Sequence, residues 1–342
     1  MKILFDHNEP YSLAHGGFQI LISETATALR AQGVEVEYLR WWDAEQRGDV
    51  IHYFGRANPT HIRFAHAKGM KYVMHELLTS QGSRTACRLR MQGLVNRFFA
   101  KVLPSSFRLP LRWDSYQLAD AVIASTEWEG WIMKTLFNVP SNRLHIVPTG
   151  VHDDFFPKNH AFRVPADKTC VSFLLPDEKP LLVTLATITE RKRVVEMAKG
   201  AIAADVRLIV IGKPYSLNDP YYKKFLQIVE HSNGLVLYEP DLTTPAEITP
   251  IFRKANGFIL LSTMETQSTA ALAASASNCP LLLSDLPWAR CTFGNKATYV
   301  THFGPDAITA AIQRFISQMA VSPPAVSSWR DVASQLTHIY TA

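Results

Sequence analysis

The feature that most constrains this chain of 342 residues is an alternation of short apolar runs with helical stretches, and the alternation occurs twice. Each apolar run is rich in Val, Ile, Leu or aromatic residues and is followed by Gly, Pro or polar residues, which is typical of buried strands. The strands expected in the first half are 2–5, 34–39, 50–55, 71–75, 121–125 and 144–148. This alternation predicts a parallel sheet with helices on both faces.

The alternation begins again after a polar, irregular stretch that contains several prolines, residues 152–180. The strands expected in the second half are 180–186, 206–212, 234–240, 257–262 and 280–285. We therefore predict an α/β protein with two domains, residues 1–160 and 170–322, and a closing segment, 323–342. In parallel α/β domains, ligands bind at the carboxyl ends of the strands.

Composition places the chain among globular proteins, because 47% of its residues are hydrophobic and 19% are charged. Its apolar runs fall short of the ~18–20 residues that span a bilayer. Asp6 follows too closely on the N-terminus for a signal peptide. The four cysteines are far apart and have no metal-binding spacing. We expect a cytoplasmic protein with reduced thiols and no metal site.

Basic residues are concentrated in one segment of the first half. Between Leu77 and Trp113 no residue is acidic, and seven are basic: Arg84, Arg88, Arg90, Arg97, Lys101, Arg108 and Arg112. Without these seven, the net charge of the first 150 residues would change from +4 to −3. The basicity therefore belongs to a local surface patch.

Apolar residues between Leu89 and Leu103 recur at helical spacing, with Arg90, Arg97 and Lys101 among them. A basic amphipathic helix of this kind can lie on an anionic membrane surface. The alternative is an ordinary basic surface whose apolar side is covered by the domain's own sheet. We do not expect nucleic-acid binding, because no known nucleic-acid motif accompanies these arginines.

Three short motifs could bind an anion, and each of them follows an expected strand. Gly16 and Gly17 open the first helix, where backbone N–H groups can approach a phosphate closely. Arg191 and Lys192, followed by Arg193, could clamp a diphosphate. The alternatives are a simple strand-to-helix turn at the glycines and a solvated helix start at the cations.

The third motif follows the strand that ends at Ser262. Ser268 and Thr269 begin an Ala-rich helix whose N–H groups could hold a phosphate, and Glu265 in the loop could accept hydrogen bonds from sugar hydroxyls. The alternative is that Ser268 or Thr269 only caps the helix.

The order of these motifs resembles the family 4 glycosyltransferases of the GT-B fold. The order is GG-x-Q, ADAVIASTEWE, HIVPTGV, I-x-x-RK, a strand that ends in Gly, S-x-x-E before a small-residue helix, and a closing SSWRDVASQLTHIY. Each motif is loose, but their order covers almost the whole chain. The resemblance implies two Rossmann-like domains that face a central cleft, the first binding the acceptor and the second the nucleotide-sugar donor. It also implies a C-terminal helix, within 323–342, that crosses back to the first domain.

The resemblance implies a role for each matching residue. His75 and Glu265 would be catalytic: His75 beside the reacting carbon, and Glu265 on the hydroxyls of the donor sugar. For His75 the alternative is a core histidine at a strand end. The implied donor-binding residues are Gly16, Gly17, Arg191, Lys192, Ser268 and Thr269.

Three positions depart from the family pattern. Ala273 stands eight residues after Glu265, where the family has a second glutamate that holds the ribose. Thr187 stands where an arginine is expected five residues before Lys192. The sequence at 149–152 reads Thr-Gly-Val-His instead of Asn-Gly-Val-Asp.

The implied function is sugar transfer with retention, from a nucleotide-diphosphate sugar to a glycan, lipid-linked or small-molecule acceptor. It implies no cofactor and no metal, because the cations could stabilise the leaving diphosphate. The expected location is cytoplasmic, with a peripheral place on the inner face of the membrane. The alternative is a non-catalytic GT-B protein that binds a nucleotide or sugar, for which Ala273 is the support.

Overall fold

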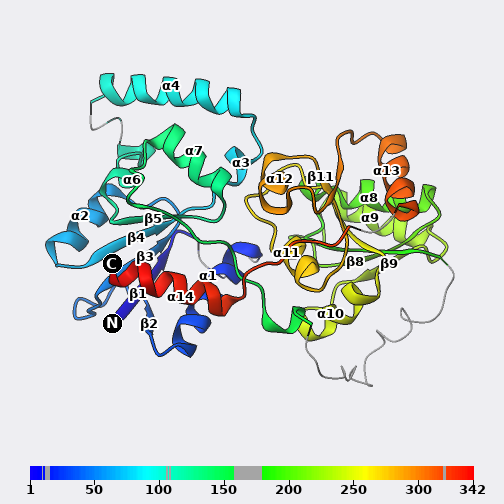
Figure 1. Ribbon diagram of the computed structural model, residues 1–342, viewed down its shortest axis with the longest axis horizontal. Coiled ribbons are helices and arrows are strands. Elements are labelled where there is room, and N and C mark those ends of the chain that lie inside the picture. The colour runs from blue at the N-terminus through cyan, green and yellow to red at the C-terminus, as the bar shows by residue number, and fades with distance from the viewer. Residues whose placement is uncertain (10, 12–15, 105–106, 108, 158–178, 319–320) are drawn as a thin grey trace. The chain divides into compact units, whose positions relative to one another are not determined.

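The computed structural model describes residues 1–9, 11, 16–104, 107, 109–157, 179–318 and 321–342. It divides into two compact units (Figure 1). Unit 1 comprises Met1–Gly150, Glu265–Gln267 and Ser327–Ala342, and unit 2 comprises Val151–Met264 and Ser268–Val326. Among the described residues, no helix combines the length and the apolar character needed to cross a membrane.

Unit 1 is built on a six-stranded parallel sheet in the order β2-β1-β3-β4-β5-β6. Its strands are β1 (Lys2–His7), β2 (Glu35–Tyr38), β3 (Val50–Phe54), β4 (Lys71–His75), β5 (Ala121–Ala124) and β6 (Leu144–Ile146). Each lies at a strand expected from the sequence. Because β1 pairs with both β2 and β3, the chain order of the strands reverses at β1.

Helices cover both faces of this sheet. They are α1 (Gly17–Ala31), α2 (Pro59–Ala67), α3 (Thr79–Gly82), α4 (Ala86–Val102), η1 (Leu109–Leu111), α6 (Ser115–Leu118), α7 (Glu127–Phe137) and α14 (Trp329–Thr341). Residues of α1 and α14 share one hydrophobic cluster with the sheet, and residues of α2 and α7 share another. The two clusters form because residues along a strand alternate between the two faces.

The last helix, α14, packs against α1 in unit 1. Ser328 and Asp331 form a capping box at its start. Trp329 is 7% exposed, and Gly150 lies against it so closely that a Cβ there would come within 2.5 Å of the indole ring. The buried apolar face of the helix is therefore what places the end of the chain in unit 1.

Unit 2 contains a second six-stranded parallel sheet, in the order β12-β11-β10-β7-β8-β9. Its strands are β7 (Leu181–Leu185), β8 (Arg207–Ile211), β9 (Val236–Glu239), β10 (Gly257–Leu260), β11 (Leu281–Ser284) and β12 (Thr298–Val300). The first five correspond to expected strands. The sequence did not predict β12, because a three-residue edge strand has no detectable apolar run.

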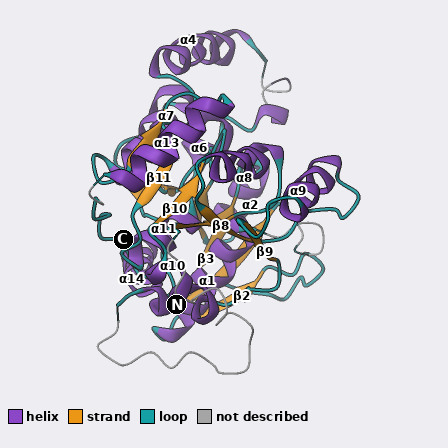
Figure 2. Cartoon of the chain, turned by 90° about the vertical axis from the view of Figure 1, so that its right-hand side faces the viewer, coloured by secondary structure: helices purple, strands orange, loops and turns teal. Residues whose placement is uncertain are grey.

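The remaining described elements of unit 2 are helical: η2 (Asp153–Phe155), η4 (Glu190–Lys192), α8 (Val194–Ala203), α9 (Pro220–Glu230), α10 (Pro245–Lys254), α11 (Thr269–Ala276), α12 (Pro287–Phe293) and α13 (Pro305–Ser317). Helix α8 packs on β8 and α9 on β9 (Figure 2). The boundary expected between residues 160 and 170 lies outside the described residues. Val151 and Phe155 are already buried in the core of unit 2, so this unit begins before that boundary.

Candidate functional site

The sheet of unit 2 reverses its strand order between two central strands. Strand β7 pairs with β8 on one side and with β10 on the other. In open parallel sheets, ligands bind outside the carboxyl ends of the strands at such a reversal. The loops that follow β7 and β10 carry two of the three anion-binding motifs expected from the sequence, so the fold brings these motifs to one place.

Hydrogen bonds hold these two loops of unit 2 together. The Thr263 N–H donates to the carbonyl oxygen of Arg191 at 2.8 Å. The Arg191 guanidinium donates to the carbonyl oxygen of Met264 at 2.9 Å. Arg191 therefore fastens the two loops, and Lys192 lies beside it, half-buried at the end of η4.

The third cation of the run supports the loop. Arg193 has a left-handed backbone conformation, with φ 53°. Its guanidinium donates to the carbonyl oxygen of Leu261 at 3.0 Å and lies 3.8 Å from the centre of the Phe303 ring. Arg193 thus holds the loop after β10 in place within unit 2. This leaves Arg191 and Lys192 as the candidates for binding a diphosphate.

A glycine lets the loop after β7 lie close to the end of β8. Gly212 has φ +135°, and a Cβ there would come within 2.3 Å of the carbonyl oxygen of Ala186. A larger residue at 212 would push this loop away, because side chains rarely adopt that conformation and the space is filled.

Helix α11 begins directly after the loop that follows β10. The Ser268 hydroxyl accepts a hydrogen bond from the Ala271 N–H at 3.3 Å, so Ser268 is the cap that the sequence offered as an alternative. Thr269 is the first helical residue. The first N–H groups of a helix have no acceptor within it and carry a partial positive charge. Ser268 can cap the helix while other N–H groups at this helix start bind a phosphate, so phosphate binding here stays a prediction.

Three residues of the loop between β10 and α11 group with unit 1, although the sequence assigned them to the second domain. The Gln267 side-chain oxygen accepts a hydrogen bond from the Thr149 N–H at 2.8 Å. The Thr266 hydroxyl is hydrogen bonded to the Thr79 hydroxyl at 3.0 Å. Glu265 belongs to the same group and is 8% exposed.

This arrangement brings the two expected catalytic residues onto neighbouring segments of unit 1. His75 ends β4, and Thr79 lies in the short stretch that follows it. Gly82, at the end of α3, lies against the backbone of Glu265, and a Cβ there would come within 2.9 Å of the Glu265 carbonyl oxygen. The segment after His75 therefore touches the segment that carries Glu265.

His75 is buried, with 3% of its surface exposed. Neither ring nitrogen has a hydrogen-bond partner among the described residues. Burial lowers its pKa to about 4, so the imidazole is neutral at pH 7. A buried polar group without a partner is uncommon and calls for an explanation, such as a functional role.

A second buried histidine, His52, lies beside His75, and the sequence analysis did not identify it. The two rings are stacked with their centres 5.7 Å apart. His52 Nδ1 is hydrogen bonded to the hydroxyl of Tyr340 in α14 at 2.5 Å. Burial lowers the pKa of His52 well below its usual value. Its only sequence signal is a histidine in the middle of an apolar run.

An ion pair that the sequence also did not reveal joins the loops after β3 and β4. The Arg56 guanidinium donates to both carboxylate oxygens of Glu76, at 3.1 and 3.0 Å. The Tyr116 hydroxyl donates to the same carboxylate, and Arg112 donates to the Arg56 carbonyl oxygen at 3.0 Å. Bidentate pairs of this kind fix geometry, so the segment after His75 is held in one position.

A buried glutamate holds the same segment from the other side. The Glu129 carboxylate accepts hydrogen bonds from the N–H groups of Leu78 at 2.6 Å and Ser125 at 2.7 Å. Its own N–H donates to the Thr126 hydroxyl at 3.1 Å, which caps α7. Burial raises the pKa of Glu129 to about 8. Glu129, in the first turn of α7, thus helps to position the residues that follow β4.

At the reversal in unit 1, the end of β1 carries a buried carboxyl group. Asp6 is 6% exposed, and its Oδ1 accepts a hydrogen bond from the Trp41 indole N–H at 3.2 Å. Burial raises the Asp6 pKa. The Trp41 ring is 69% exposed and Trp42 is 83% exposed. An exposed indole ring beside a carboxyl group, as at Trp41 and Asp6, offers a surface on which a sugar ring can stack.

The two expected glycines lie at the start of α1. Gly16 precedes the helix with φ +152°, a conformation that favours glycine, and Gly17 is its first residue. Gln19, in the first turn of the helix, is 8% exposed. The His15 of the same motif lies outside the described residues. A contact with the donor stays a prediction for both glycines.

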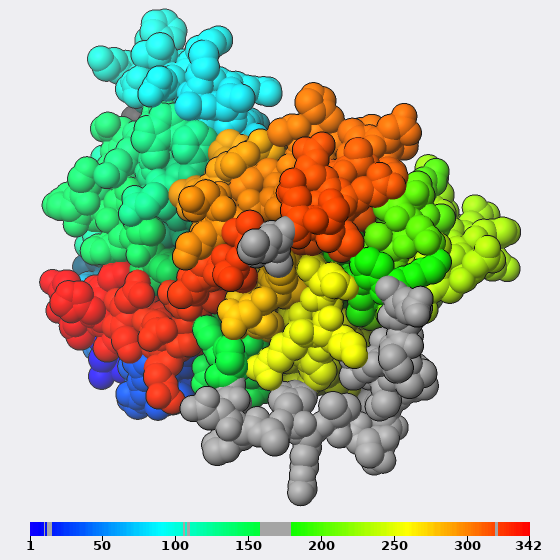
Figure 3. Space-filling view, turned by 45° about the vertical axis from the view of Figure 1, so that its right-hand side comes forward, coloured from blue at the N-terminus to red at the C-terminus, as the bar shows by residue number. Residues whose placement is uncertain are grey.

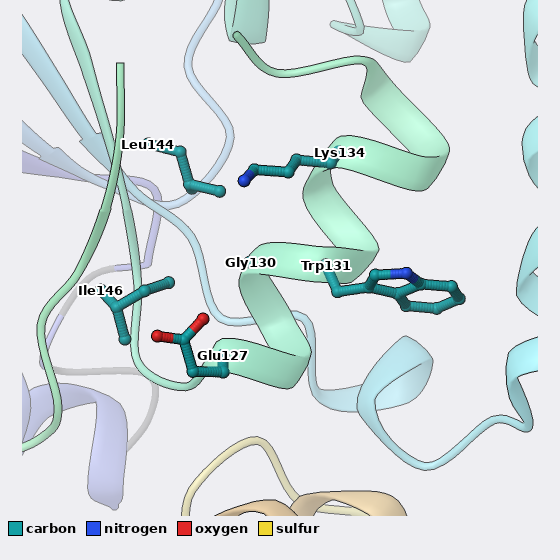
Figure 4. Close-up of a pocket in the computed structure, with 6 residues that line it drawn as sticks. All are labelled: Glu127, Gly130, Trp131, Lys134, Leu144 and Ile146. Carbon is teal, nitrogen blue, oxygen red and sulfur yellow. The ribbon is translucent and has the colours of Figure 1, made fainter. Parts of the chain in front are cut away.

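A pocket lies elsewhere in unit 1, between α7 and β6. It is lined by Glu127, Gly130, Trp131, Lys134, Leu144 and Ile146. Glu127 and Lys134 both extend from α7 toward β6 (Figure 4). None of the site residues expected from the sequence lines this pocket.

By sequence, the chain matches no protein-family model and no curated protein. Its structure is similar to that of a sucrose-phosphate synthase from Thermosynechococcus elongatus, with a TM-score of 0.69 and 14% identity over 100% of this chain and 98% of the other. It is also similar to the crystal structure of Anabaena Alr3699/HepE in complex with UDP and glucose. That match has a TM-score of 0.65 and 13% identity, and it covers 100% of this chain and 97% of the other.

A third similar structure is WaaG, a glycosyltransferase involved in lipopolysaccharide biosynthesis. Its TM-score is 0.59, and its identity is 13% over 99% of this chain and 95% of the other. These likenesses show the fold, which is that of the GT-B glycosyltransferases, and confirm the α/β class with two Rossmann-like units.

Proposed function

We propose that this chain is a retaining glycosyltransferase that moves a sugar from a nucleotide-diphosphate sugar to a hydroxyl-bearing acceptor. One observation carries the proposal. The Arg191-Lys192 motif and the loop that leads to α11 follow the two strands at the reversal of the unit 2 sheet, and hydrogen bonds fasten them to each other. The GT-B fold and the complexes of Anabaena HepE with UDP and UDP-glucose support the choice of donor class.

The proposed reaction breaks the bond between the sugar C1 and the diphosphate and forms a bond between C1 and the acceptor oxygen. The leaving diphosphate gains negative charge, which Arg191, Lys192 and the first N–H groups of α11 would stabilise. In the retaining path that we favour, the leaving phosphate takes the proton of the acceptor hydroxyl, so no base from the protein is needed.

His75 and Glu265 would act on the sugar. At pH 7 the His75 imidazole is neutral, because burial lowers its pKa to about 4. A neutral ring can orient a hydroxyl group or stabilise the reacting carbon without adding a competing charge. The Glu265 carboxylate would accept hydrogen bonds from the hydroxyls of the donor sugar.

For the acceptor, we favour a glycan or a lipid-linked glycan over a small molecule that lacks a sugar. The exposed Trp41 ring, which donates a hydrogen bond to the Asp6 carboxyl group at the carboxyl end of β1, supports a sugar ring as the acceptor. Stacking on the indole and a hydrogen bond to a carboxylate are complementary to the apolar and polar parts of a pyranose.

The test is turnover of a donor panel. The full chain is incubated with sugars of UDP, GDP, ADP and CMP and with glycan and glycolipid acceptors, and released nucleotide is measured together with the stereochemistry of the product. We expect acceptor-dependent release from one donor class, with retention. Inversion would contradict the proposed path, and release that does not depend on any acceptor would contradict transfer.

A second function is supported by one observation. Ala273, where the family has a ribose-binding glutamate, is 5% exposed in α11, so nothing at this position offers a carboxylate. The chain would then bind a nucleotide sugar without turning it over. Specific thermal stabilisation by one nucleotide sugar, without release of nucleotide in the presence of every acceptor, would identify this function.

A further inference from the structure

Helix α4 (Ala86–Val102) is the outermost element of unit 1, and it lies over α7 (Figure 1). Its packing is the reverse of that of an ordinary surface helix. The residues that it buries are Leu89, Gly93 and Asn96. The large apolar residues that it exposes are Met91, Leu94, Val95, Phe98, Phe99 and Val102, with exposed fractions between 42% and 64%.

Contacts with α7 fix this orientation. Gly93 lies so close to α7 that a Cβ would come within 2.5 Å of the carbonyl oxygen of Thr135. The Asn96 side chain donates to the carbonyl oxygen of Leu136 at 3.3 Å, and Arg97 donates to that of Thr135 at 3.3 Å. Rotation of α4 to bury its apolar side would place a larger residue where only glycine fits. The fold therefore holds the apolar side of α4 outward.

The outward side has a defined pattern of charge. At about 100° per residue, the six exposed apolar residues fall within an arc of about 140°. Arg90, Arg97 and Lys101 fall together in an arc of about 40° along one border, and all three are exposed. No residue from Leu77 to Trp113 is acidic. In Figure 3, α4 stands out from α7 at the surface of unit 1.

We propose that this outward side of α4 docks the protein on the surface of an anionic lipid bilayer, with the helix axis in the plane of the membrane. The apolar arc would enter the interface, and the three cations on its border would meet anionic headgroups. The proposal depends only on α4 and is independent of the proposed transferase activity.

Charge decides between a membrane and a second copy of the chain as the occupant of this surface. Two copies that met through this side of α4 would bring cations against cations with no carboxylate between them, and like charges oppose association. An anionic bilayer supplies both an apolar interior and the opposite charge. It is therefore the surface that complements both parts of the pattern.

Vesicle flotation of the full chain tests this docking. The vesicles contain either phosphatidylcholine alone or equal parts of phosphatidylcholine and phosphatidylglycerol, at low salt. We expect flotation with the anionic vesicles, weak flotation with the neutral ones, and release as salt screens the charges. Protein that stays at the bottom with anionic vesicles at low salt would overturn the proposal, and so would equal binding to both vesicles.

Two variants separate the contributions of charge and apolar surface. The triple variant R90S/R97S/K101S and the double variant L94S/F98S should each reduce the bound fraction at least about 10-fold. The double variant changes only exposed side chains, so loss of folding does not account for its effect. A control with equal loss of charge is K199S/K223S/K224S, on exposed positions of α8 and α9 in unit 2, and it should bind like the wild type.

Association of this surface with a second copy of the chain would give a different experimental result. If this side of α4 joins two copies of the chain, light scattering without vesicles would show a dimer that L94S/F98S converts to a monomer, and that result would overturn membrane docking. Binding that the unit 2 control reduces as much as the α4 triple variant would also overturn it, because the attraction would then belong to the whole surface.

Discussion

The two units share a parallel six-stranded sheet but bury different kinds of polar side chain. In unit 2, the buried polar residues among those described are all serines and threonines: Thr184, Ser232, Thr249, Ser262, Ser268, Ser275, Ser277 and Ser284. In unit 1, they include carboxyl and imidazole groups: Asp6, His52, His75, Glu129 and Glu265. Among the described residues, buried carboxyl and imidazole groups therefore occur in unit 1 and not in unit 2.

The difference shows which unit carries buried groups that lower its stability. Burial of an ionisable group without a full set of partners costs free energy, and such groups are enriched at functional sites. Unit 2 offers backbone N–H groups and surface cations around an apolar core, which suits a rigid holder of a phosphate. Unit 1 holds the buried titratable groups. Four experiments can break or sharpen this contrast.

The largest expected effect is on the stability of unit 1 alone. Trp329→Ala removes a side chain that is 7% exposed and packed on Gly150. Replacement of a buried tryptophan by alanine costs about 3–5 kcal/mol. Hydrogen exchange should speed up in peptides of α1 and α14 and stay unchanged in peptides of β7 and β8.

The control for this change is Trp42→Ala, because Trp42 is 83% exposed. It should alter the unfolding free energy by less than about 0.5 kcal/mol. Faster exchange in both units of the Trp329 variant would show that they unfold as one body and would remove the contrast in stability.

The next effect is acid sensitivity, which should appear in unit 1. The pKa of His75 is about 4 in the folded chain against 6.5 for an ordinary histidine. Between these values the unfolded chain binds more protons than the folded one, so stability falls as the pH falls from 6.5 to 4. The loss from His75 should approach about 3 kcal/mol at the acid end.

Urea unfolding at pH 7 and at pH 5, monitored by hydrogen exchange in peptides of each unit, measures this loss of stability. His75→Phe removes the titrating ring at similar size, and it should flatten the pH dependence of unit 1 while His52 retains its own part. An unchanged slope in this variant would mean that His75 keeps an ordinary pKa in the folded chain.

A smaller effect is expected when unit 2 loses a cation that we propose to bind phosphate. Lys192→Ala should lower kcat/KM for the donor by roughly 10- to 150-fold, because a charged hydrogen bond contributes about 1.5–3 kcal/mol. Lys199→Ala, an exposed lysine of α8, should change kcat/KM little. Equal kinetics of the folded Lys192 variant and the wild type would remove Lys192 from the donor site.

The smallest expected effect tests the role that we propose for Glu265, in the loop after β10. Glu265→Gln should lower the transfer rate about 10-fold, the equivalent of about 1.4 kcal/mol, and leave the affinity for the free nucleotide unchanged. Glu190→Gln, at an exposed carboxylate of η4, is the matched control. An equal fall in nucleotide affinity for the Glu265 variant would mean that Glu265 holds the nucleotide and not the sugar.

Much of the fold could be predicted from the sequence because strand and helix patterns are local. Strands such as β4 and β8 show a clear apolar run with a polar stop, and each appears where it was expected. The edge strand β12 was missed because three residues carry no periodicity. A helix was expected from the apolar spacing between Leu89 and Leu103, and α4 spans Ala86–Val102. Its apolar side faces outward, so the alternative in which the domain's own sheet covers that side is wrong.

The candidate site was predictable to the extent that its residues lie next to strand ends. Arg191 and Lys192 follow β7, and Ser268 begins the helix after β10, so parallel pairing of β7 with β10 was enough to bring them to one edge. His52 and the Arg56–Glu76 pair could not be found in this way, because their partners come from distant parts of the chain.

The sequence by itself determined the two α/β units, the order of the motifs and the local charge of residues 77–113, because hydrophobic periodicity and composition act over short stretches of chain. Only the tertiary structure decided which groups lose their contact with water. Burial lowered the pKa of His75, close packing at Gly93 turned the apolar side of α4 outward, and hydrogen bonds to Thr79 and Thr149 placed the segment after Glu265 in unit 1. Each of these depends on contacts between residues far apart in the chain, which no local pattern encodes.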